Sequence, residues 1–574
     1  MTQALLKIPI GESDFRLLIQ DRYYFVDKSL FIQDILEDSR ILLITRPRRF
    51  GKTLNLSMLR YYFAKEVDGQ ETDNLFKGLN IQHAPEEIRQ HQGKYPVIFL
   101  SLKDIKYHSY ADAYAALVTI LAELYREHHY LLNSSALLDY EKTQYQALLT
   151  KQASKIDIEF SLKVLSTYLH RHHKVAPIIL IDEYDTPIQS GYLNNYYPDI
   201  VELFRNFLGA ALKDNPHCFK AVLTGILRVS KESLFSGLNN ICVYSVLNER
   251  YGQYFGFTEE EVQVLLEQFG LKAQSEGIRR WYNGYQIGSA MIYNPWSILN
   301  CVKEAGQLRR YWLNTSDNAL VKDCFYRSGL IHKELFEELL QGHSIGCAID
   351  ELIVFPDLKN LNKNDAIILG FLLMAGYFKA VSVDYSRRGT KCQLAIPNIE
   401  IEGLYADLIE DWLIEGQDRI TVNEFLQALL SGNMAEFEDS FRFLLENTIS
   451  VHDLSQNPEA FYHGFMTGLT AHLQSHPAYE LRSNKESGYG RYDYLILSRV
   501  PEKLTLLMEF KRVSVSKTDT LEKIEAALEA AAQDALKQIE EKAYDREAQH
   551  CSCSNILKIA IAFCGKRFKL VYRT

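Results

Sequence analysis

The chain is long enough for several domains, and its composition is that of a globular protein. Its 574 residues suggest about three or four domains. Hydrophobic residues make up 47% and charged residues 24%, which excludes a mainly disordered, collagen-like or disulfide-scaffold chain. The formal net charge of −10 argues against a protein that coats nucleic acid, although a local basic groove is compatible with it.

Cysteine usage and the lack of long apolar segments indicate a cytoplasmic protein. The nine cysteines show no framework spacing, as expected of reduced thiols. Cys551 and Cys553, with Cys564 further on, lack a fourth ligand at a suitable spacing, which disfavours a metal site there. The first residues have no signal-peptide pattern, and the longest apolar run, 366–378, is too short to cross a bilayer. We therefore expect a cytoplasmic protein with no membrane partner.

The first part of the chain alternates apolar strands with amphipathic helices. Continuous apolar runs are typical of parallel strands that are covered on both faces. Four such runs occur, at 41–44, 96–102, 177–181 and 220–224. Helices are predicted between them, for example at 110–128 and 200–213. This order predicts a parallel α/β sheet.

The helical pattern dominates from about residue 250 to 440. Helices are predicted at 259–269 and 334–341. A helix at 365–376 is followed by two strands, at 377–383 and 391–397, an order that suits a winged-helix-like module.

A third region starts near residue 457. The predicted elements in order are a helix at 459–473, strands at 492–497 and 505–511, a long helix at 518–542, and strands at 556–563 and 568–572. The chain is therefore expected to divide into a parallel α/β domain (1–248), a helical and winged-helix-like middle region (249–450) and a C-terminal α/β domain (451–574).

A phosphate-binding loop is predicted directly after the first strand. Gly51, Lys52 and Thr53 form the second half of a GxxxxGK[ST] motif, and a helix follows them. Main-chain N–H groups at such a helix start point at phosphate, and the helix dipole favours its negative charge. Lys52 would neutralise the β- and γ-phosphate oxygens, and the Thr53 hydroxyl would bind Mg²⁺. The residues predicted to bind nucleotide here are Arg49, Phe50, Gly51, Lys52, Thr53 and Leu54.

The motif departs from its usual form at Arg46, which stands where the first glycine is expected. The loop must close without the conformational freedom of that glycine or adopt an altered conformation. Pro47, Arg48 and Arg49 make the loop stiffer and more cationic. The alternative interpretation is a basic turn before an ordinary helix.

A second motif supports nucleotide binding. The apolar run 178–181 ends in Asp182 and Glu183, the pattern of a Walker B strand. Asp182 would hold Mg²⁺ through water, and Glu183 would orient and deprotonate the attacking water. The alternative, a strand that ends in a helix cap, better suits Asp185, which precedes a proline by two residues.

Two further residues extend this site. Thr224 ends the fourth predicted strand, at a position where it would sense the γ-phosphate. Arg228 follows near a helix start and would act as a sensor arginine, or as an arginine finger for a neighbouring subunit in a homo-oligomer. A surface ion pair is the alternative role for Arg228.

The third region carries a carboxylate pattern. Asp493 lies in one predicted strand, and Glu509 and Lys511 point to the same face of the next. Asp493 and Glu509 would hold Mg²⁺, which activates water and stabilises a pentavalent phosphate, while Lys511 would orient the water or stabilise negative charge. Glu459 would complete the site as a further acid, with His463 one turn on. An exposed hairpin with a Glu–Lys pair is the alternative.

Basic residues near these strands, Arg482, Lys485 and Arg491, would contact a phosphate backbone or would simply be solvated charges. The aromatic stretch 281–296 is interpreted mainly as a packed, turn-rich core rather than as a binding surface.

These motifs together resemble the bacterial AAA-ATPase-like family. The blocks that carry the resemblance are 46–53, 181–185, 224–228, 234–240, 281–285 and 293–296. Members of that family have an N-terminal P-loop ATPase-like domain and commonly a C-terminal PD-(D/E)XK nuclease-like domain. Asp493, Glu509 and Lys511 resemble the signature of such nucleases, and Gln538 and Tyr544 resemble residues of the helix that supports their site. The resemblance implies that Arg46 is a trait of the family.

Two functional hypotheses follow. The first is an ATP-binding protein, expected to be an ATPase, whose P-loop domain controls a Mg²⁺-dependent nuclease-like domain that acts on DNA or RNA. The second is a nucleotide-dependent switch or scaffold whose terminal domain binds nucleic acid or protein without cutting it. A third possibility is that neither site turns over and that the likeness is one of fold.

Overall fold

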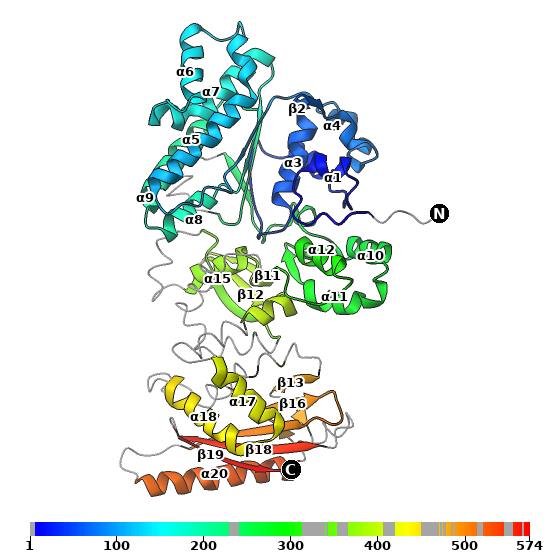
Figure 1. Ribbon diagram of the computed structural model, residues 1–574, viewed down its shortest axis with the longest axis vertical. Helices are drawn as coiled ribbons and strands as arrows, with labels where there is room; N and C mark the ends of the chain where they lie inside the picture. The colour runs from blue at the N-terminus through cyan, green and yellow to red at the C-terminus, as the bar shows by residue number, and fades with distance from the viewer. Residues whose placement is uncertain are drawn as a thin grey trace. The chain divides into compact units, whose positions relative to one another are not determined.

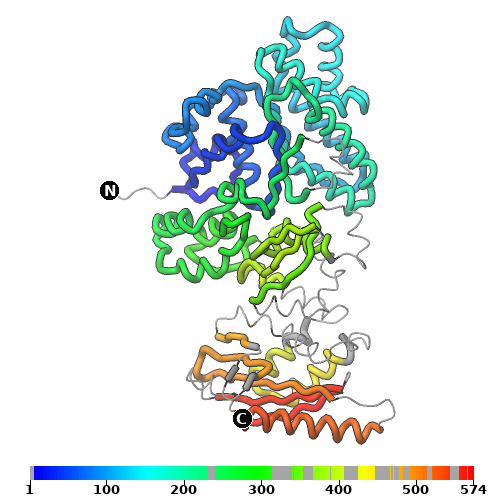
Figure 2. Tube along the Cα trace, turned by 180° about the vertical axis from the view of Figure 1, so that it is seen from behind, coloured from blue at the N-terminus to red at the C-terminus, as the bar shows by residue number. Residues whose placement is uncertain are grey.

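The computed structural model of the chain divides into two compact units (Figure 1, Figure 2). The first comprises Met1–Cys324 and Gly346–Glu400, and the second comprises Phe325–Ile345 and Ile401–Thr574. The structure describes residues 6–228, 240–312, 339, 342–352, 365–387, 389–405, 419–448, 466, 470, 473, 478–483, 486–487, 490–513, 520–542, 544, 555–564 and 567–574.

A five-stranded parallel sheet forms the centre of the first unit. Its strand order is β4-β5-β6-β1-β7, and every neighbouring pair is parallel. The strands are β1 (Ile41–Thr45), β4 (Val97–Ser101), β5 (Ile178–Asp182), β6 (Lys220–Gly225) and β7 (Ile241–Tyr244). The four predicted strands are confirmed as β1, β4, β5 and β6. β7 is not among the predicted strands, because its four residues are only half-buried and form no long apolar run.

Helices lie on both sides of this sheet, which explains why its strands are apolar throughout (Figure 1). α3 (Lys52–Phe63) lies on the same side as the N-terminal elements. The other side carries α5 (Tyr110–Glu127), α6 (Asp139–Leu149), α7 (Lys155–His173), α8 (Thr186–Leu193) and α9 (Tyr197–Leu212). Ser109 and Ser154 accept main-chain N–H groups at the starts of α5 and α7, so side-chain caps define where these helices begin.

Short elements complete the N-terminal part of the first unit. They are α1 (Phe15–Gln20), α2 (Phe31–Glu37), β2 (Glu66–Val67), β3 (Gln70–Glu71) and α4 (Glu86–Arg89).

The middle of the chain contributes two further substructures to the first unit. One consists of α10 (Glu259–Gln268), α11 (Ser275–Tyr282), β8 (Tyr285–Ile287), β9 (Ala290–Ile292) and α12 (Pro295–Lys303). The other consists of α15 (Asp365–Met374), β11 (Lys379–Ser386) and β12 (Gly389–Ala395), with β10 (Ile345–Ile349) next to β12 in a three-stranded sheet. The predicted helix and hairpin are therefore confirmed. The helix predicted at 334–341 falls almost wholly outside the described residues.

The second unit is built on a mixed five-stranded sheet of order β13-β16-β17-β18-β19. The strands are β13 (Tyr479–Ser483), β16 (Tyr494–Ser498), β17 (Thr505–Arg512), β18 (Ile556–Cys564) and β19 (Arg567–Arg573). Only β17 and β18 are parallel, because α20 (Leu521–Glu541) forms the crossover between them and packs against both.

Two helices and a short hairpin accompany this sheet. They are α17 (Arg419–Ser431), α18 (Met434–Thr448), β14 (Glu486–Ser487) and β15 (Gly490–Arg491). The four strands and the long helix predicted for this region are confirmed, whereas the helix predicted at 459–473 lies mostly outside the described residues.

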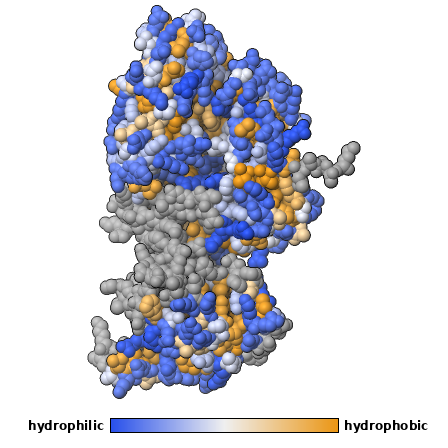
Figure 3. Space-filling view, viewed as in Figure 1, coloured by the Kyte–Doolittle hydropathy of each residue, from blue (hydrophilic) through white to orange (hydrophobic). Residues whose placement is uncertain are grey.

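The visible face of the first unit is mainly hydrophilic, with scattered apolar side chains (Figure 3). Within the described part of the chain, no helix combines the length and the apolar character that a membrane span requires.

Candidate functional site

The predicted phosphate-binding loop connects β1 to α3. Gly51 occupies the N-cap position of α3 with φ 81°, in the left-handed region. A Cβ built on Gly51 meets nothing within 4 Å, so it is the backbone conformation, not lack of space, that favours glycine here. The first N–H groups of α3 are thereby turned towards the loop, as a phosphate-binding helix start requires.

Arg46 does not contribute its side chain to the mouth of this loop. It is fully buried, and its φ is not positive, so the position does not need a glycine. Its guanidinium donates hydrogen bonds to four main-chain carbonyl oxygens, those of Thr45, Tyr244, Ser245 and Arg250, at 2.8–3.2 Å. Burial lowers the pKa of Arg46 to about 9, so the side chain is still charged at neutral pH. Arg46 thus attaches the base of the loop to the end of β7.

The tip of the loop is held by aromatic residues from the middle of the chain. The indole N–H of Trp312 donates to the carbonyl oxygen of Arg48 at 3.2 Å, and Trp312 is almost fully buried. The Phe50 ring packs edge-on against Tyr285, with ring centroids 5.0 Å apart. A Cβ on Gly376, just after α15, would lie 2.9 Å from Pro47 Cβ, so glycine permits this close approach. We call these contacts the loop clamp.

Arg49 lies at the exposed side of the loop. Its φ of 69° is unusual for a residue other than glycine. The centre of its guanidinium lies 3.9 Å from the ring centroid of Trp296 in α12, a cation–π contact. The stretch 281–296 therefore does two things: Tyr282 and Tyr293 belong to a hydrophobic core, while Trp296 faces the loop.

Three of the predicted site residues form one hydrogen-bonded set. The Asp182 carboxylate, at the end of β5, accepts hydrogen bonds from Thr53 Oγ1 and Thr224 Oγ1, both at 2.7 Å. The strand order brings them together, because β6, which ends near Thr224, lies between β1 and β5. Burial raises the pKa of Asp182, and the two hydroxyl hydrogen bonds counteract this effect. The three side chains present a carboxylate and two hydroxyls, all hard oxygen ligands that suit Mg²⁺.

Lys52 reaches back over the loop. Its ammonium donates to the carbonyl oxygens of Arg46 and Pro47 at 3.1 and 2.9 Å. Burial lowers the pKa of Lys52, and the carboxylates of Glu183, Asp182 and Asp185 oppose that shift. A buried cation next to the helix start is well placed to meet an anion.

Glu183 and Asp185 follow β5 and have different surroundings. Glu183 has a φ of 51° and lines the same cavity as Lys52, and its carboxylate accepts a hydrogen bond from Thr186 Oγ1 at 3.3 Å. Asp185 occupies the N-cap position of α8, with proline in the first turn as expected, but its side chain makes no capping hydrogen bond. The Asp185 carboxylate accepts instead the N–H groups of Ile226 and Leu227, which follow β6 and are otherwise without partners in a ladder.

Arg228 is the last described residue before the gap at 229–239, and it is half-buried. Its predicted role as a sensor or finger stays a prediction.

A cavity of about 550 Å³ opens in front of the loop. It lies between the start of α3 and a wall formed by residues 9–13, 24–28, 254–257 and 295–299. This volume falls within the range of small-molecule and cofactor sites. Cationic side chains in its lining outnumber acidic ones six to three, although the whole chain is acidic. The cationic ones are Lys28, Arg48, Arg49, Lys52, Lys103 and Lys106.

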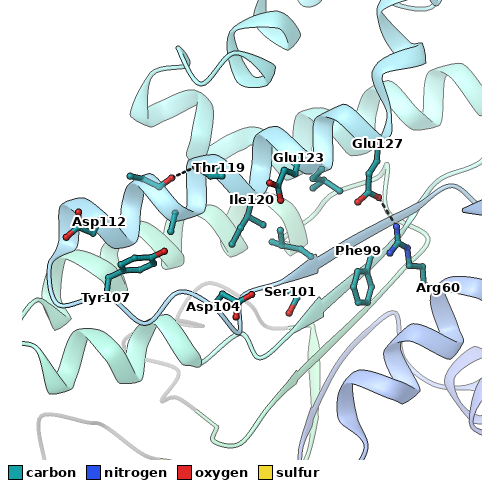
Figure 4. A pocket seen from close by; sticks show the side chains of 14 residues that line it. Arg60, Phe99, Ser101, Asp104, Tyr107, Asp112, Thr119, Ile120, Glu123 and Glu127 are labelled. Atoms are coloured by element: carbon teal, nitrogen blue, oxygen red, sulfur yellow. Dashed lines mark hydrogen bonds and ion pairs between the residues drawn. The ribbon is translucent and has the colours of Figure 1, made fainter. Parts of the chain in front are cut away.

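A second cavity, of about 590 Å³, lies between α5 and β4 (Figure 4). Its lining is acidic, with Asp104, Asp112, Glu123 and Glu127 around it. Its one arginine, Arg60, is paired with Glu127 at 2.9 Å. A triphosphate would be repelled here, so the charge of the two linings selects the cavity at the loop as the anion site.

In the second unit, Glu509 lies on β17, and Asp493 lies directly before the neighbouring strand β16. Glu509 is almost fully buried, and Lys511 lies 3.5 Å from its carboxylate. Burial, together with the nearby Asp493 carboxylate, raises the pKa of Glu509 to about 8. Oε2 of Glu509 is buried without a hydrogen-bond partner among the described residues. An unpartnered buried carboxylate oxygen next to a second carboxylate fits a bound divalent cation.

Two more predicted residues join this site. Gln538 of α20 donates hydrogen bonds to Oε1 of Glu509 and to the Tyr544 hydroxyl, the latter at 3.0 Å. Asp493 accepts the main-chain N–H of Phe510 at 2.7 Å, which fixes one carboxylate relative to the other. Among the described residues, no group of three or more His, Cys, Asp or Glu side chains is placed to hold a metal ion.

The other predicted residues of this region are not brought into the site. Glu459, His463 and Lys485 lie outside the described residues. Arg491 is described only through the backbone of β15. Arg482 forms an ion pair with Glu480 at 2.9 Å, so it is engaged within its own strand. The cysteine pair at 551 and 553 also lies outside the described residues.

A parallel sheet whose strand β1 leads through a Gly-Lys-Thr loop into α3 is the architecture of a P-loop NTPase. The mixed sheet of the second unit, with one acid on β17 and another directly before β16, is a nuclease-like α/β fold. Residues 9–235 match the family described as predicted AAA-ATPase, and residues 457–572 match the PD-(D/E)XK nuclease superfamily. The chain thus carries an AAA-ATPase-like domain at its N-terminus and a PD-(D/E)XK nuclease superfamily domain at its C-terminus, as the resemblance predicted.

One relative matches over most of both chains. It is an uncharacterized protein in the vnfD 5′ region of Azotobacter chroococcum mcd 1, 27% identical over 529 residues, which cover 89% of this chain and 90% of that protein. A solved structure, that of the Aeropyrum pernix ORC1 protein in complex with DNA, covers 69% of this chain and 96% of its own with 11% identity. Its TM-score is 0.24, which is too low to bear on this chain.

Proposed function

We propose that the first unit binds ATP with Mg²⁺ at the loop between β1 and α3. The observation that carries this proposal is the set of hydrogen bonds from Thr53 and Thr224 to Asp182, of which Thr53 also lines the cationic cavity. Mg²⁺ would neutralise phosphate charge there, and Thr53 and Asp182 would hold it.

The remaining residues of the loop then have defined tasks. Lys52 leaves the two loop carbonyls and pairs with the terminal phosphates, and the N–H groups at Gly51–Leu54 bind phosphate oxygens. Glu183 orients and deprotonates the attacking water, and Thr224 contacts the γ-phosphate. Arg228 acts as a sensor, or as an arginine finger if the chain forms a homo-oligomer. Binding is better supported than hydrolysis, because Glu183 is the single candidate for the base.

For the second unit, we propose a Mg²⁺-dependent nuclease site that acts on phosphodiesters of DNA or RNA. Asp493 and Glu509 hold the cation, with Glu459 as a further acid, and Lys511 orients the water or stabilises negative charge. Gln538 keeps the Glu509 carboxylate in position.

Titration calorimetry with ATP tests the first proposal. Lys52→Ala is expected to weaken ATP binding on the order of 100-fold, because a buried charge–phosphate pair is lost. Lys213→Ala removes an exposed cation outside the lining of the cavity and is the matched control, with a change below about threefold expected. Equal affinities of wild type and Lys52→Ala would contradict the proposal.

Cleavage of DNA and RNA with Mg²⁺ tests the second. Asp493→Ala is expected to abolish cutting while nucleic acid is still bound, whereas Asp534→Ala, at an exposed position of α20, leaves cutting intact. If the wild type binds nucleic acid but never cuts, the alternative holds: a nucleotide-dependent switch or scaffold whose terminal domain binds without cleaving.

A further inference from the structure

Arg49 occupies a position from which a phosphate is within reach. It lines the same cavity as Lys52 and Glu183 and lies two residues before Gly51, so its Cα is within about 7 Å of the helix start. An extended arginine side chain covers a comparable distance. The guanidinium can therefore point either towards a triphosphate or away from it.

In the structure it points away, onto Trp296. The 3.9 Å distance to the indole is the closest cation–π approach in the described part of the chain. Arg49 forms no hydrogen bond with any described residue, so its N–H groups are available to an anion. A cation–π contact at an exposed position is worth about 0.5–1 kcal/mol, less than a charge-assisted bond to phosphate. A phosphate in the cavity can therefore displace the guanidinium from the indole.

The backbone at Arg49 gives a second argument. A left-handed φ of 69° in an arginine is a strained conformation, and such strain concentrates where a binding site needs a particular side-chain direction. Burial lowers the pKa of Arg49, while the Glu183 carboxylate opposes that shift, so the guanidinium lies within electrostatic range of the proposed catalytic base.

We propose that the Arg49 guanidinium packs on the Trp296 indole when no nucleotide is bound, and that it moves from the indole to the γ-phosphate when ATP binds. The chain then supplies an arginine to the terminal phosphate from within its own loop and discriminates ATP from ADP. This inference rests on the proposed ATP site. The alternative is a purely structural role, in which the Arg49–Trp296 contact holds the loop against α12.

The two roles differ in their effect on ATP and ADP. With Arg49→Ala, ATP affinity is expected to fall about tenfold, while ADP affinity changes less than twofold. Trp296→Leu removes the indole on which Arg49 packs when no nucleotide is bound. This variant is expected to raise ATP affinity and leave ADP affinity unchanged. Lys213→Ala, at an exposed position after α9 and outside the lining of the cavity, is the control and should leave both affinities as in the wild type.

Tryptophan fluorescence gives a readout besides affinity. The part of the emission that is absent from Trp296→Phe is expected to change when ATP is added and not when ADP is added. If Arg49→Ala weakens ATP and ADP equally, or neither, the proposal is overturned while the ATP site stands. If the wild type binds no ATP, the proposed function itself fails and this inference falls with it.

Discussion

Arg46 shows how one side chain replaces a glycine that a loop of this kind usually contains. The main-chain carbonyls of residues 244, 245 and 250 converge at the base of the loop, and the guanidinium donates to all of them. A glycine would leave these carbonyls without a partner in a buried region. The arginine therefore satisfies a cluster of carbonyl acceptors. Most of these acceptors lie about 200 residues away in the sequence, so the residues around Arg46 do not predict them.

Restoring the usual glycine should consequently be harmful. Arg46→Gly is expected to lower the free energy of unfolding by about 2–4 kcal/mol, since it removes four hydrogen bonds and leaves a cavity. Denaturant titration measures the loss. Arg48→Gly, at a half-buried neighbouring position, controls for the effect of glycine on the unfolded chain, where about 1 kcal/mol is expected. A stability of Arg46→Gly equal to that of the wild type would refute the role of the guanidinium.

Glu509 makes the stability of the second unit depend on pH. Its pKa is about 8 in the folded chain, against about 4.3 when unfolded, so the folded state holds a proton that the unfolded state has lost. The favourable contribution is complete below about pH 4.3 and is lost as the pH rises through about 8.

Glu509→Gln should remove this dependence. Its melting temperature is expected to match the wild type below about pH 4.3 and to exceed it near pH 8.5, at about 2–4 °C per kcal/mol. Mg²⁺ should raise the melting temperature of the wild type more than that of the variant, because it pairs with the carboxylate. The exposed Glu502→Gln serves as control. A difference that does not grow with pH would contradict the raised pKa.

At the scale of elements, the sequence was sufficient wherever a strand or helix is marked by a continuous pattern. The apolar runs predicted β1, β4, β5 and β6, and the Gly-Lys-Thr block predicted the start of α3. β7 was missed because it is short and only half-buried, and β13 was missed because it is short and carries mixed side chains. The carboxylates at the ends of strands were found because acidic residues after apolar runs stand out.

The loop clamp was not predictable in the same way. Trp312 and Gly376 contact a loop more than 250 residues earlier, and no local pattern reports such a pairing. The aromatic stretch 281–296 was interpreted mainly as core, which is right for Tyr282 but misses Trp296 at the loop. Contacts between distant segments depend on packing, which single-sequence patterns do not encode.

Trp312→Phe tests the loop clamp as an element. The variant keeps an aromatic ring next to Tyr377, but it loses the hydrogen bond from the indole N–H to the Arg48 carbonyl oxygen. The free energy of unfolding is expected to fall by about 1–3 kcal/mol and ATP affinity to fall several-fold. Trp281→Phe removes an indole that packs away from the loop and should leave ATP affinity unchanged. Unaltered ATP binding in Trp312→Phe would show that the clamp does not shape the site.

At the scale of the whole molecule, the chain passes from the first unit to the second directly after Glu400. Glu400 is fully buried, and it accepts hydrogen bonds from the Trp312 main-chain N–H and from Ser297 Oγ, each at 2.7 Å. Burial raises its pKa to about 7. The residue that precedes the second unit is thus bonded to the residue that holds the phosphate-binding loop.

If nucleotide binding affects the second unit, this connection is a route by which it would do so. We expect ATP to change the rate of Mg²⁺-dependent cleavage by the wild type and to have no effect in Lys52→Ala. Gel assays of nicking with and without ATP measure this difference. If cleavage by Lys52→Ala responds to ATP as the wild type does, ATP binding at the loop does not control cleavage.

Because Trp312, Gly376 and Glu400 all belong to the first unit, this unit is not a detachable ATPase followed by a spacer. Recombination that exchanged only the first 248 residues would separate the phosphate-binding loop from the residues of the loop clamp that contact it. Evolution is therefore expected to have kept residues 1–324 and 346–400 together, and, because residues 325–345 of the second unit lie between them in the chain, to have transferred that segment with them.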